Sequence, residues 1–232
     1  MILLTILVAC LDARAYAQGP RSATGDARLD VRLREEAAKV SCQATAADFR
    51  GTEVVLSRGE KHVVYSLNDE GCQQTLLVVF RKNPLGGPWS HLQTIVLPLR
   101  YGVKPLVEYP EFAEKGVHEI FIKDFVSDWG TGVLQRDAVI FKLIDGKLRV
   151  IFDGPAMIRF RPSDYHLTED VKYTVAPSEV DGVSGYSYLK VVTHVSTGKQ
   201  SMQRERSCIW SESLAHFNCV ETTPDFERTR GR

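Results

Sequence analysis

Short runs of β-branched and aromatic residues, separated by turn residues, recur along almost the whole chain. The clearest are "QQTLLVVFR" at 73–81, "VLQRDAVIFKLI" at 133–144 and "GYSYLKVVTHVS" at 185–196. Asp145 and Gly146 stand between two such runs, which is the signal for a two-residue type I′ hairpin. The spacing predicts an all-β fold, an antiparallel meander of about 10–12 short strands arranged as a propeller, sandwich or barrel.

One segment near the N-terminus fits two structures equally well. In "LDVRLREEAAKV" at 29–40, Leu29, Leu33 and Ala37 recur at helical spacing, whereas the first half alternates as a strand would. The sequence therefore predicts at most one short N-terminal helix and leaves the choice open. We expect a flexible linker at 18–27, a single β domain at 28–221 and a disordered tail at 222–232.

The segment 1–17 has the character of an export signal. An apolar run from Ile2 to Leu11 precedes Ala15-Tyr16-Ala17, the small-x-small pattern cut by signal peptidase. The run is shorter than a membrane-spanning helix, which needs roughly 20 residues. We expect 1–17 to be removed and the protein to be secreted or periplasmic in a bacterium. "LVAC" at 7–10 also resembles a lipobox, so an envelope lipoprotein scaffold anchored on Cys10 is an alternative, and a buried first strand is another.

Four cysteines remain once Cys10 is removed. A hairpin that sets Trp210 opposite Phe217 also sets Cys208 opposite Cys219, on the same face and in a close pair that suits a disulfide. Cys42 with Cys72 follows by exclusion, and an oxidising compartment would favour both bonds. No Cys-x-x-Cys arrangement points to zinc or to thiol redox chemistry.

Charge and length exclude several classes of function. The 29 basic residues balance 29 acidic ones, so no long-range field draws nucleic acid to the protein. At 232 residues with 44% hydrophobic content, the chain is large enough for a substantial core. We expect burial of residues in the most apolar runs: Leu76, Val78, Ile120, Ile122, Ile140, Phe141, Leu148, Val150, Val191 and Trp210.

The segment "SDWGTGVLQRD" at 127–137 is the candidate binding site. In and around it stand Asp124, Asp128, Trp129, Arg136 and Asp137, and Trp129 could stack on a sugar. We expect a hairpin turn in which Gly130 and Gly132 adopt positive φ. The acids lack the alternate-residue spacing of a calcium loop, so no metal site is predicted. A structural interpretation stands beside it, with Asp124 and Asp128 capping strand ends and Arg136 paired to an acid on a neighbouring strand.

Catalytic motifs are missing from the sequence. His118 and Glu119 lack the second histidine of a metalloprotease helix, and there is neither a G-x-S-x-G elbow nor a phosphate-binding loop. The remaining catalytic alternative is a secreted carbohydrate-active hydrolase that uses carboxylates near 119–137. His62, His91, His166, His194 and His216 show no ligand spacing and are interpreted as ordinary histidines.

A family resemblance covers "HEIFIKDFVSDWGTGVLQRDAVIFKLIDGKLRVIFD" at 118–153. This stretch resembles the blade-like repeats of exported bacterial FG-GAP and related propeller-type proteins. The resemblance implies an antiparallel β fold and a surface for contact with a protein or glycan, and it implies no catalytic residues. We therefore expect a non-catalytic binding domain without a cofactor, whose partner is a protein or glycan of the cell envelope or outside the cell.

Overall fold

The computed structural model describes residues 24–69, 72, 74–83, 87–98, 104–130, 133–160, 167–177, 187–197, 200–211, 213–214 and 216–221. The predicted signal peptide, including Cys10, and the predicted tail at 222–232 lie outside these ranges, as does His166. No helix within the described ranges is both long and apolar enough to cross a membrane.

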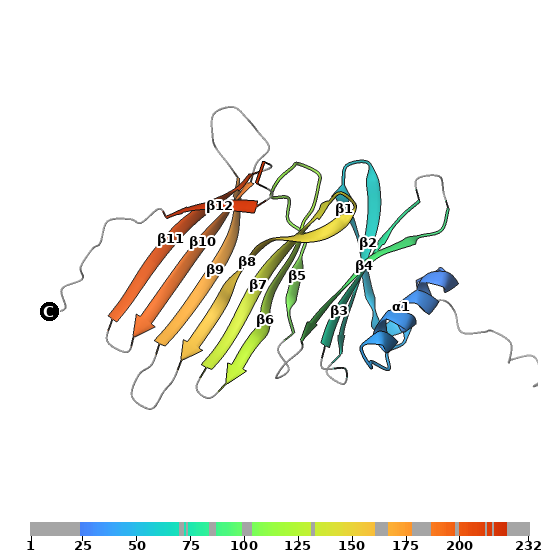
Figure 1. Ribbon diagram of the computed structural model, residues 1–232, viewed down its shortest axis with the longest axis horizontal. Coiled ribbons are helices and arrows are strands. Elements are labelled where there is room, and N and C mark those ends of the chain that lie inside the picture. Colours follow the sequence, from blue (N-terminus) through green and yellow to red (C-terminus); the bar gives the residue numbers. More distant parts are fainter. Residues whose placement is uncertain are drawn as a thin grey trace, which may run out of the picture.

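The protein is built from two antiparallel sheets (Figure 1). A four-stranded sheet has the order β1-β2-β3-β4, with β1 (Arg50–Ser57), β2 (Glu60–Asp69), β3 (Gln74–Arg81) and β4 (Ser90–Pro98). An eight-stranded sheet runs from β12 to β5 and contains β5 (Leu106–Glu108), β6 (Ile120–Gly130), β7 (Val133–Ile144), β8 (Lys147–Phe160), β9 (Leu167–Pro177), β10 (Ser187–Thr197), β11 (Gln200–Ser211) and β12 (His216–Glu221). Within each sheet, strands adjacent in sequence are adjacent in space, which confirms the predicted all-β meander.

Two local predictions about hairpins are confirmed. Asp145 has φ of 51° and Gly146 has φ of 71°. These two residues join β7 to β8, and positive φ at both is what a type I′ turn requires. In the β11–β12 hairpin, Trp210 pairs with Phe217 and Cys208 with Cys219.

Both predicted disulfides form, Cys208–Cys219 and Cys42–Cys72. Two disulfides indicate an oxidising, extracytoplasmic location, because thiols are kept reduced in the cytosol.

The undecided N-terminal segment is a helix, α1 (Ala27–Lys39). Its start is fixed by Asp26, whose side chain accepts the N–H of Arg28 at 2.9 Å. Helical spacing buries Leu29, Leu33 and Ala37 along one face, a continuous contact that a strand could not provide from these positions. The predicted linker at 18–27 therefore overlaps the beginning of this helix.

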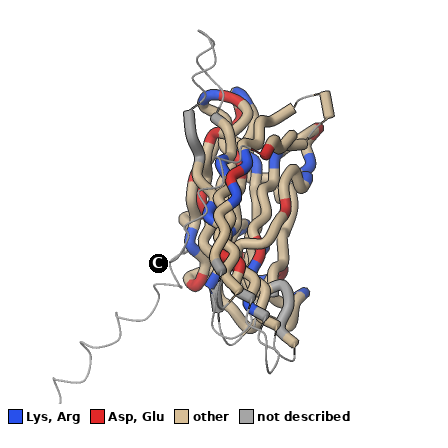
Figure 2. The backbone as a smooth tube through the Cα atoms, turned by 90° about the vertical axis from the view of Figure 1, so that its left-hand side faces the viewer, with Lys and Arg blue, Asp and Glu red and all other residues tan. Residues whose placement is uncertain are grey.

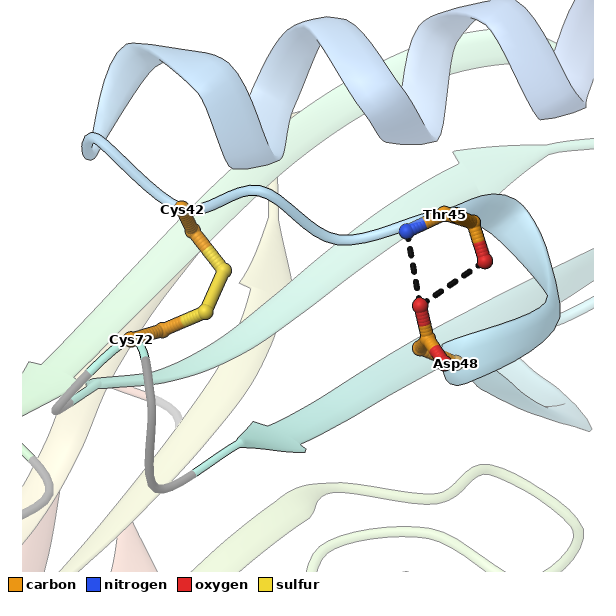
Figure 3. The surroundings of a disulfide bond; sticks show 4 residues. All are labelled: Cys42, Thr45, Asp48 and Cys72. Carbon is orange, nitrogen blue, oxygen red and sulfur yellow. Dashed lines mark hydrogen bonds between the residues drawn. A yellow bond between two sulfur atoms is a disulfide. The ribbon is translucent and has the colours of Figure 1, made fainter.

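The chain after α1 is fastened to the four-stranded sheet. Cys42 follows the helix and is bonded to Cys72, in the connection between β2 and β3 (Figure 3). A short 3-10 turn, η1 (Ala46–Asp48), comes next, and the carboxylate of Asp48 accepts from both the N–H and the hydroxyl of Thr45. The disulfide and the cap together fix the path of the chain from α1 into β1.

Three apolar clusters hold the layers together. The first packs α1 on the outer face of the four-stranded sheet, and the second fills the space between the two sheets around Leu77, Ile95 and Ile122. The third lies on the other face of β6–β8, where β10, β11 and β12 close over Phe121 and Ile140. Phe112, from the segment before β6, completes this third cluster.

Most of the predicted core is buried. Eight residues are buried as expected: Leu76, Val78, Ile120, Ile122, Ile140, Leu148, Val191 and Trp210. Phe141 is only partly buried, at the margin of the cluster between the sheets. The prediction for Val150 is wrong, because this side chain is 52% exposed. Val150 shares its face of β8 with Leu148, but that face is no longer covered two residues further along the strand.

Residues of both charges are interspersed along the backbone (Figure 2). This distribution accompanies the balanced formal charge of the sequence.

The core assignment can be tested with two matched substitutions. Ile120→Ala should lower the free energy of unfolding by roughly 2–5 kcal/mol, because it opens a cavity between the sheets. Val150→Ala removes an exposed side chain and should change it by less than about 0.5 kcal/mol. Urea denaturation of both variants measures the difference; equal losses would contradict the assigned layers.

Candidate functional site

The predicted site residues all lie in the β6–β7 hairpin, between Asp124 of β6 and Asp137 of β7. This part of the hairpin, which includes its turn, is called the distal hairpin below. Asp128 and Trp129 belong to β6 and pair with Gln135 and Leu134, so they are not loop residues. Gly130 pairs with Val133, which leaves 131–132 as the connection. The side chains of Asp128 and Trp129 lie outside the described part of the structure.

The hairpin is present as predicted, but the role expected for Gly130 is wrong. Gly130 is the last residue of β6 and does not have positive φ. Gly132 lies outside the described residues. The residue of this hairpin with left-handed backbone is Asp124, with φ of 63°.

Asp124 forms an irregularity inside β6. The register shifts between Ile122 and Phe125, so two residues of β6 face the single Ala138 of β7. Such a β-bulge needs one residue of unusual backbone conformation, and aspartate tolerates the left-handed region better than most residues. Asp124 therefore shapes the strand, and the expectation that Asp124 and Asp128 cap strand ends is wrong.

Arg136 and Asp137 follow on β7. Asp137 accepts a hydrogen bond from the side chain of Gln135 at 2.8 Å. Arg136 is half-buried and makes no ion pair with any described residue, and its Nε is buried without a hydrogen-bond partner. The expected pairing of Arg136 with an acid on a neighbouring strand is therefore not found.

Glu119, the other acid considered for catalysis, has a structural role. Its carboxylate is fully buried and accepts from Lys142 Nζ at 2.8 Å and from the N–H of Phe112 at 2.8 Å. Burial raises the pKa of Glu119 above its usual value, against the effect of the Lys142 ammonium and the backbone N–H groups of Phe112 and Ala113. This buried ion pair ties the segment before β6 to β7.

Glu119 lies too far from the acids near the β6–β7 turn to act together with them. Asp137 pairs with Phe125, which lies six residues beyond Glu119 along the chain, a span of about 15–20 Å in a strand. A glycosidase needs its two carboxyl groups within about 10 Å of each other. Glu119 and Asp137 therefore cannot form a catalytic pair. Over the described ranges, no group of three or more His, Cys, Asp or Glu side chains could hold a metal ion.

A second feature, the outer edge of β12, was not identified from the sequence. β12 is the last strand of its sheet, and no described strand pairs with its other side. The Cα atoms of Cys208 and Cys219 are 3.9 Å apart, which marks a close, non-hydrogen-bonded pair. Residues of such pairs direct their N–H and C=O groups away from the partner strand. The backbone groups of Phe217, Cys219 and Glu221 therefore face outward.

Apolar side chains accompany this edge. Ile209 is 54% exposed and Val220 is 65% exposed. The register places both on the face of β11–β12 opposite the disulfide, diagonally across the ladder. An exposed edge with apolar neighbours is a ready template for a further strand.

The chain matches no protein-family model, and neither a curated protein nor a solved structure is significantly similar to it.

The buried ion pair predicts an unusual dependence on pH. Lys142→Met should lower the free energy of unfolding at pH 7.5 by about 3–5 kcal/mol, because it leaves a buried carboxylate without its cation. Because the raised pKa of Glu119 means that the folded state prefers the protonated acid, the loss should shrink as the pH falls toward 5. Urea denaturation at both pH values measures this change.

The matched control is the double variant Glu119→Gln/Lys142→Met, which has no charge to bury. It should recover part of the stability lost in Lys142→Met at pH 7.5, and its deficit should not shrink as the pH falls, because it has no carboxyl group to protonate at this site. A deficit in Lys142→Met that does not change with pH would contradict this account.

Proposed function

We propose that this protein is an exported, non-catalytic domain that binds a protein partner by accepting an extended segment alongside β12. The supporting observation is this edge, which no described strand covers, with outward-facing backbone groups at Phe217, Cys219 and Glu221. In strand addition, main-chain hydrogen bonds supply affinity, and side chains of alternate residues supply selectivity.

The disulfide prepares this edge for binding. Cys208–Cys219 locks the register of β12 against β11, so the short strand cannot slip or fray when it is not bound. On the inner face, Phe217 is buried among Phe112, Phe152 and Trp210, which fixes the middle of the strand. A template that is already ordered loses less entropy on binding than a flexible one.

The partner segment should be extended and largely uncharged where it crosses this surface. Ile209 and Val220 offer apolar contact, and the nearby charge of Lys190 is already paired with Glu205 at 2.7 Å. Charged residues are a common means of protecting a sheet edge from pairing. Within β12 only Glu221 carries a carboxylate, at the last residue of the strand.

Export is the second part of this proposal. The two disulfides support it, and the segment 1–17 has the pattern of a cleaved signal peptide. The resemblance of 118–153 to exported propeller-type repeats agrees with a contact role outside the cytoplasm. A glycan partner at the distal β6–β7 hairpin is the other outcome that this resemblance allows.

Strand addition can be blocked by a single proline. In Glu221→Pro the missing N–H faces outward, so pairing with β11 is kept while the open edge loses a donor. Ten-residue peptides selected by phage display on the oxidised protein serve as probes. Those that bind by strand addition should lose at least about tenfold in affinity, roughly 1.4 kcal/mol, in Glu221→Pro, measured by calorimetry.

Glu221→Gln removes the charge but keeps the N–H, and it should bind the same peptides as the unchanged protein. Equal loss in both variants would mean that the carboxylate, and not the backbone, is recognised. Peptides that bind Glu221→Pro as tightly as the unchanged protein would contradict strand addition at β12. Binding on a glycan array that depends on Arg136 would favour the hairpin instead.

The proposed processing can be checked by the mass of the mature protein. Expression with its own leader should yield a chain that begins at Gln18 and has no free thiol, because signal peptidase cuts after the Ala15-x-Ala17 pattern. Intact-mass spectrometry with and without reduction measures both. A chain that begins at a lipidated Cys10 would show the envelope lipoprotein instead.

A further inference from the structure

A β-bulge in β4 turns two polar side chains toward α1. The register against β3 shifts between Val79 and Phe80, which leaves Leu92 as an extra residue in β4. Leu92 and Gln93 then both face the second sheet, where Gln93 accepts the N–H of Leu148 at 3.1 Å. His91 and Thr94, three residues apart, therefore share the face that α1 covers.

These two side chains close a ring of hydrogen bonds with α1. Arg32 Nη2 lies 3.3 Å from His91 Nδ1, and His91 Nε2 lies 2.9 Å from the hydroxyl of Thr94. Thr94 donates to Glu36 at 2.8 Å, and Glu36 in turn pairs with Arg32 at 2.8 Å. Since arginine can only donate, Nδ1 of His91 must accept and Nε2 must carry the proton. The ring needs His91 in its neutral form.

The charges around His91 come from one helix. Arg32, Glu36 and Lys39 of α1 act on its ring, and on the sheet side it meets the ring of Phe80, edge to face, and the hydroxyl of Thr94. Burial lowers the pKa of His91, and Arg32 and Lys39 lower it further, while Glu36 acts in the opposite direction.

Glu36 itself stays charged over the range in which histidine titrates. Burial acts to raise its pKa, but hydrogen bonds from Lys39 and Thr94 and the charges of His91 and Arg32 hold it below the usual value. His91 is therefore the member of this ring that changes charge between neutral and mildly acidic pH.

We propose that α1 is an acid-released cover: protonation of His91 breaks the ring with Arg32 and undocks the helix from the four-stranded sheet. Protonated His91 cannot accept from Arg32. Two cations then stand in direct contact, with Arg32 Nη2 and His91 Nδ1 separated by 3.3 Å, and they repel each other. This inference does not depend on the proposed binding at β12, which lies in the other sheet.

Release of α1 uncovers an apolar surface while the chain stays attached. The face under the helix is formed by Val63, Leu67, Leu76, Val78 and Phe80. Cys42–Cys72 lies beyond the C-terminal end of α1, so the helix can swing away but remains tethered to the β2–β3 connection (Figure 3).

The direction of the pH effect follows from linkage. The pKa of His91 is lowered in the docked state, and it returns toward about 6.5 when the helix is undocked. The docked state is therefore fully favoured above about pH 6.5 and loses this advantage as the pH falls through the lowered pKa. Within that window the undocked population should rise by up to about tenfold per pH unit.

Hydrogen exchange of the α1 amides tests the proposal in the full oxidised protein. After correction for intrinsic rates, exchange in Ala27–Lys39 should rise by up to about tenfold per pH unit below about pH 6.5, while β10 and β11 remain protected. In His91→Gln, whose amide can still donate to Thr94 but cannot be protonated, protection of α1 should not depend on pH.

His62→Gln is the matched control. His62 is also buried with a lowered pKa, caused mainly by burial, but it contacts the N–H of Leu56 and not α1, so this variant should behave like the unchanged protein. If acid exposes α1 equally in His91→Gln, the proposal is wrong. An NMR titration of His91 in the unchanged protein gives an independent check, and a midpoint at or above about 6.5 would also overturn it.

Discussion

The contact between the two sheets supports the rest of the structure. β6 is buried on both faces: Ile120 and Ile122 pack into the space between the sheets, while Phe121 enters the aromatic cluster on the other side. Hydrogen bonds also join the layers, among them those from the N–H of His118 to the carbonyl of Val55 at 2.7 Å and from the N–H of Leu148 to Gln93. Both α1 and the β12 edge lie at the periphery of this double-sided core.

Each disulfide stabilises one of these peripheral parts. Cys42 and Cys72 are separated by 30 residues in the sequence, and the loop they close includes the entry from α1 into the first sheet. A loop of that length is worth roughly 3–4 kcal/mol on the chain-entropy model. Cys208 and Cys219 are separated by only 11 residues, so the contribution of their bond through chain entropy is smaller. Its main effect is local, since it fixes the register of a short strand that pairs with one described strand, β11. The covalent bonds thus stabilise the two ends of the layered structure, the entry from α1 and the last strand.

Local rules recovered much of the fold from the sequence. The pairing of Trp210 with Phe217 placed the Cys208–Cys219 bond, and Asp145–Gly146 placed a hairpin, because both depend on residues close in the chain. Features that depend on how distant segments pack together could not be predicted from the sequence. Val150 shares its strand with buried Leu148, yet only the placement of the four-stranded sheet over β8 decides which of the two side chains is covered. The position of β12 at the end of its sheet likewise depends on the order of the strands. The residues of β12 alone do not predict that order.

Bulges explain why the polar contacts were the hardest to foresee. A regular strand alternates its two faces, so residues three apart, such as His91 and Thr94, should point in opposite directions. The extra residue Leu92 puts His91 and Thr94 on the same face. No residue type in β4 predicts where this bulge occurs. Asp124 lies in another bulge, and the carbonyl of Pro155, which accepts from Tyr173, stands beside a third register shift. Where two strands pair regularly, their facing backbone N–H and C=O groups are all hydrogen-bonded, so apolar side chains can flank the pair. Where it breaks, freed backbone groups and redirected side chains need polar partners. The polar network that holds α1 is therefore a consequence of one added residue in β4.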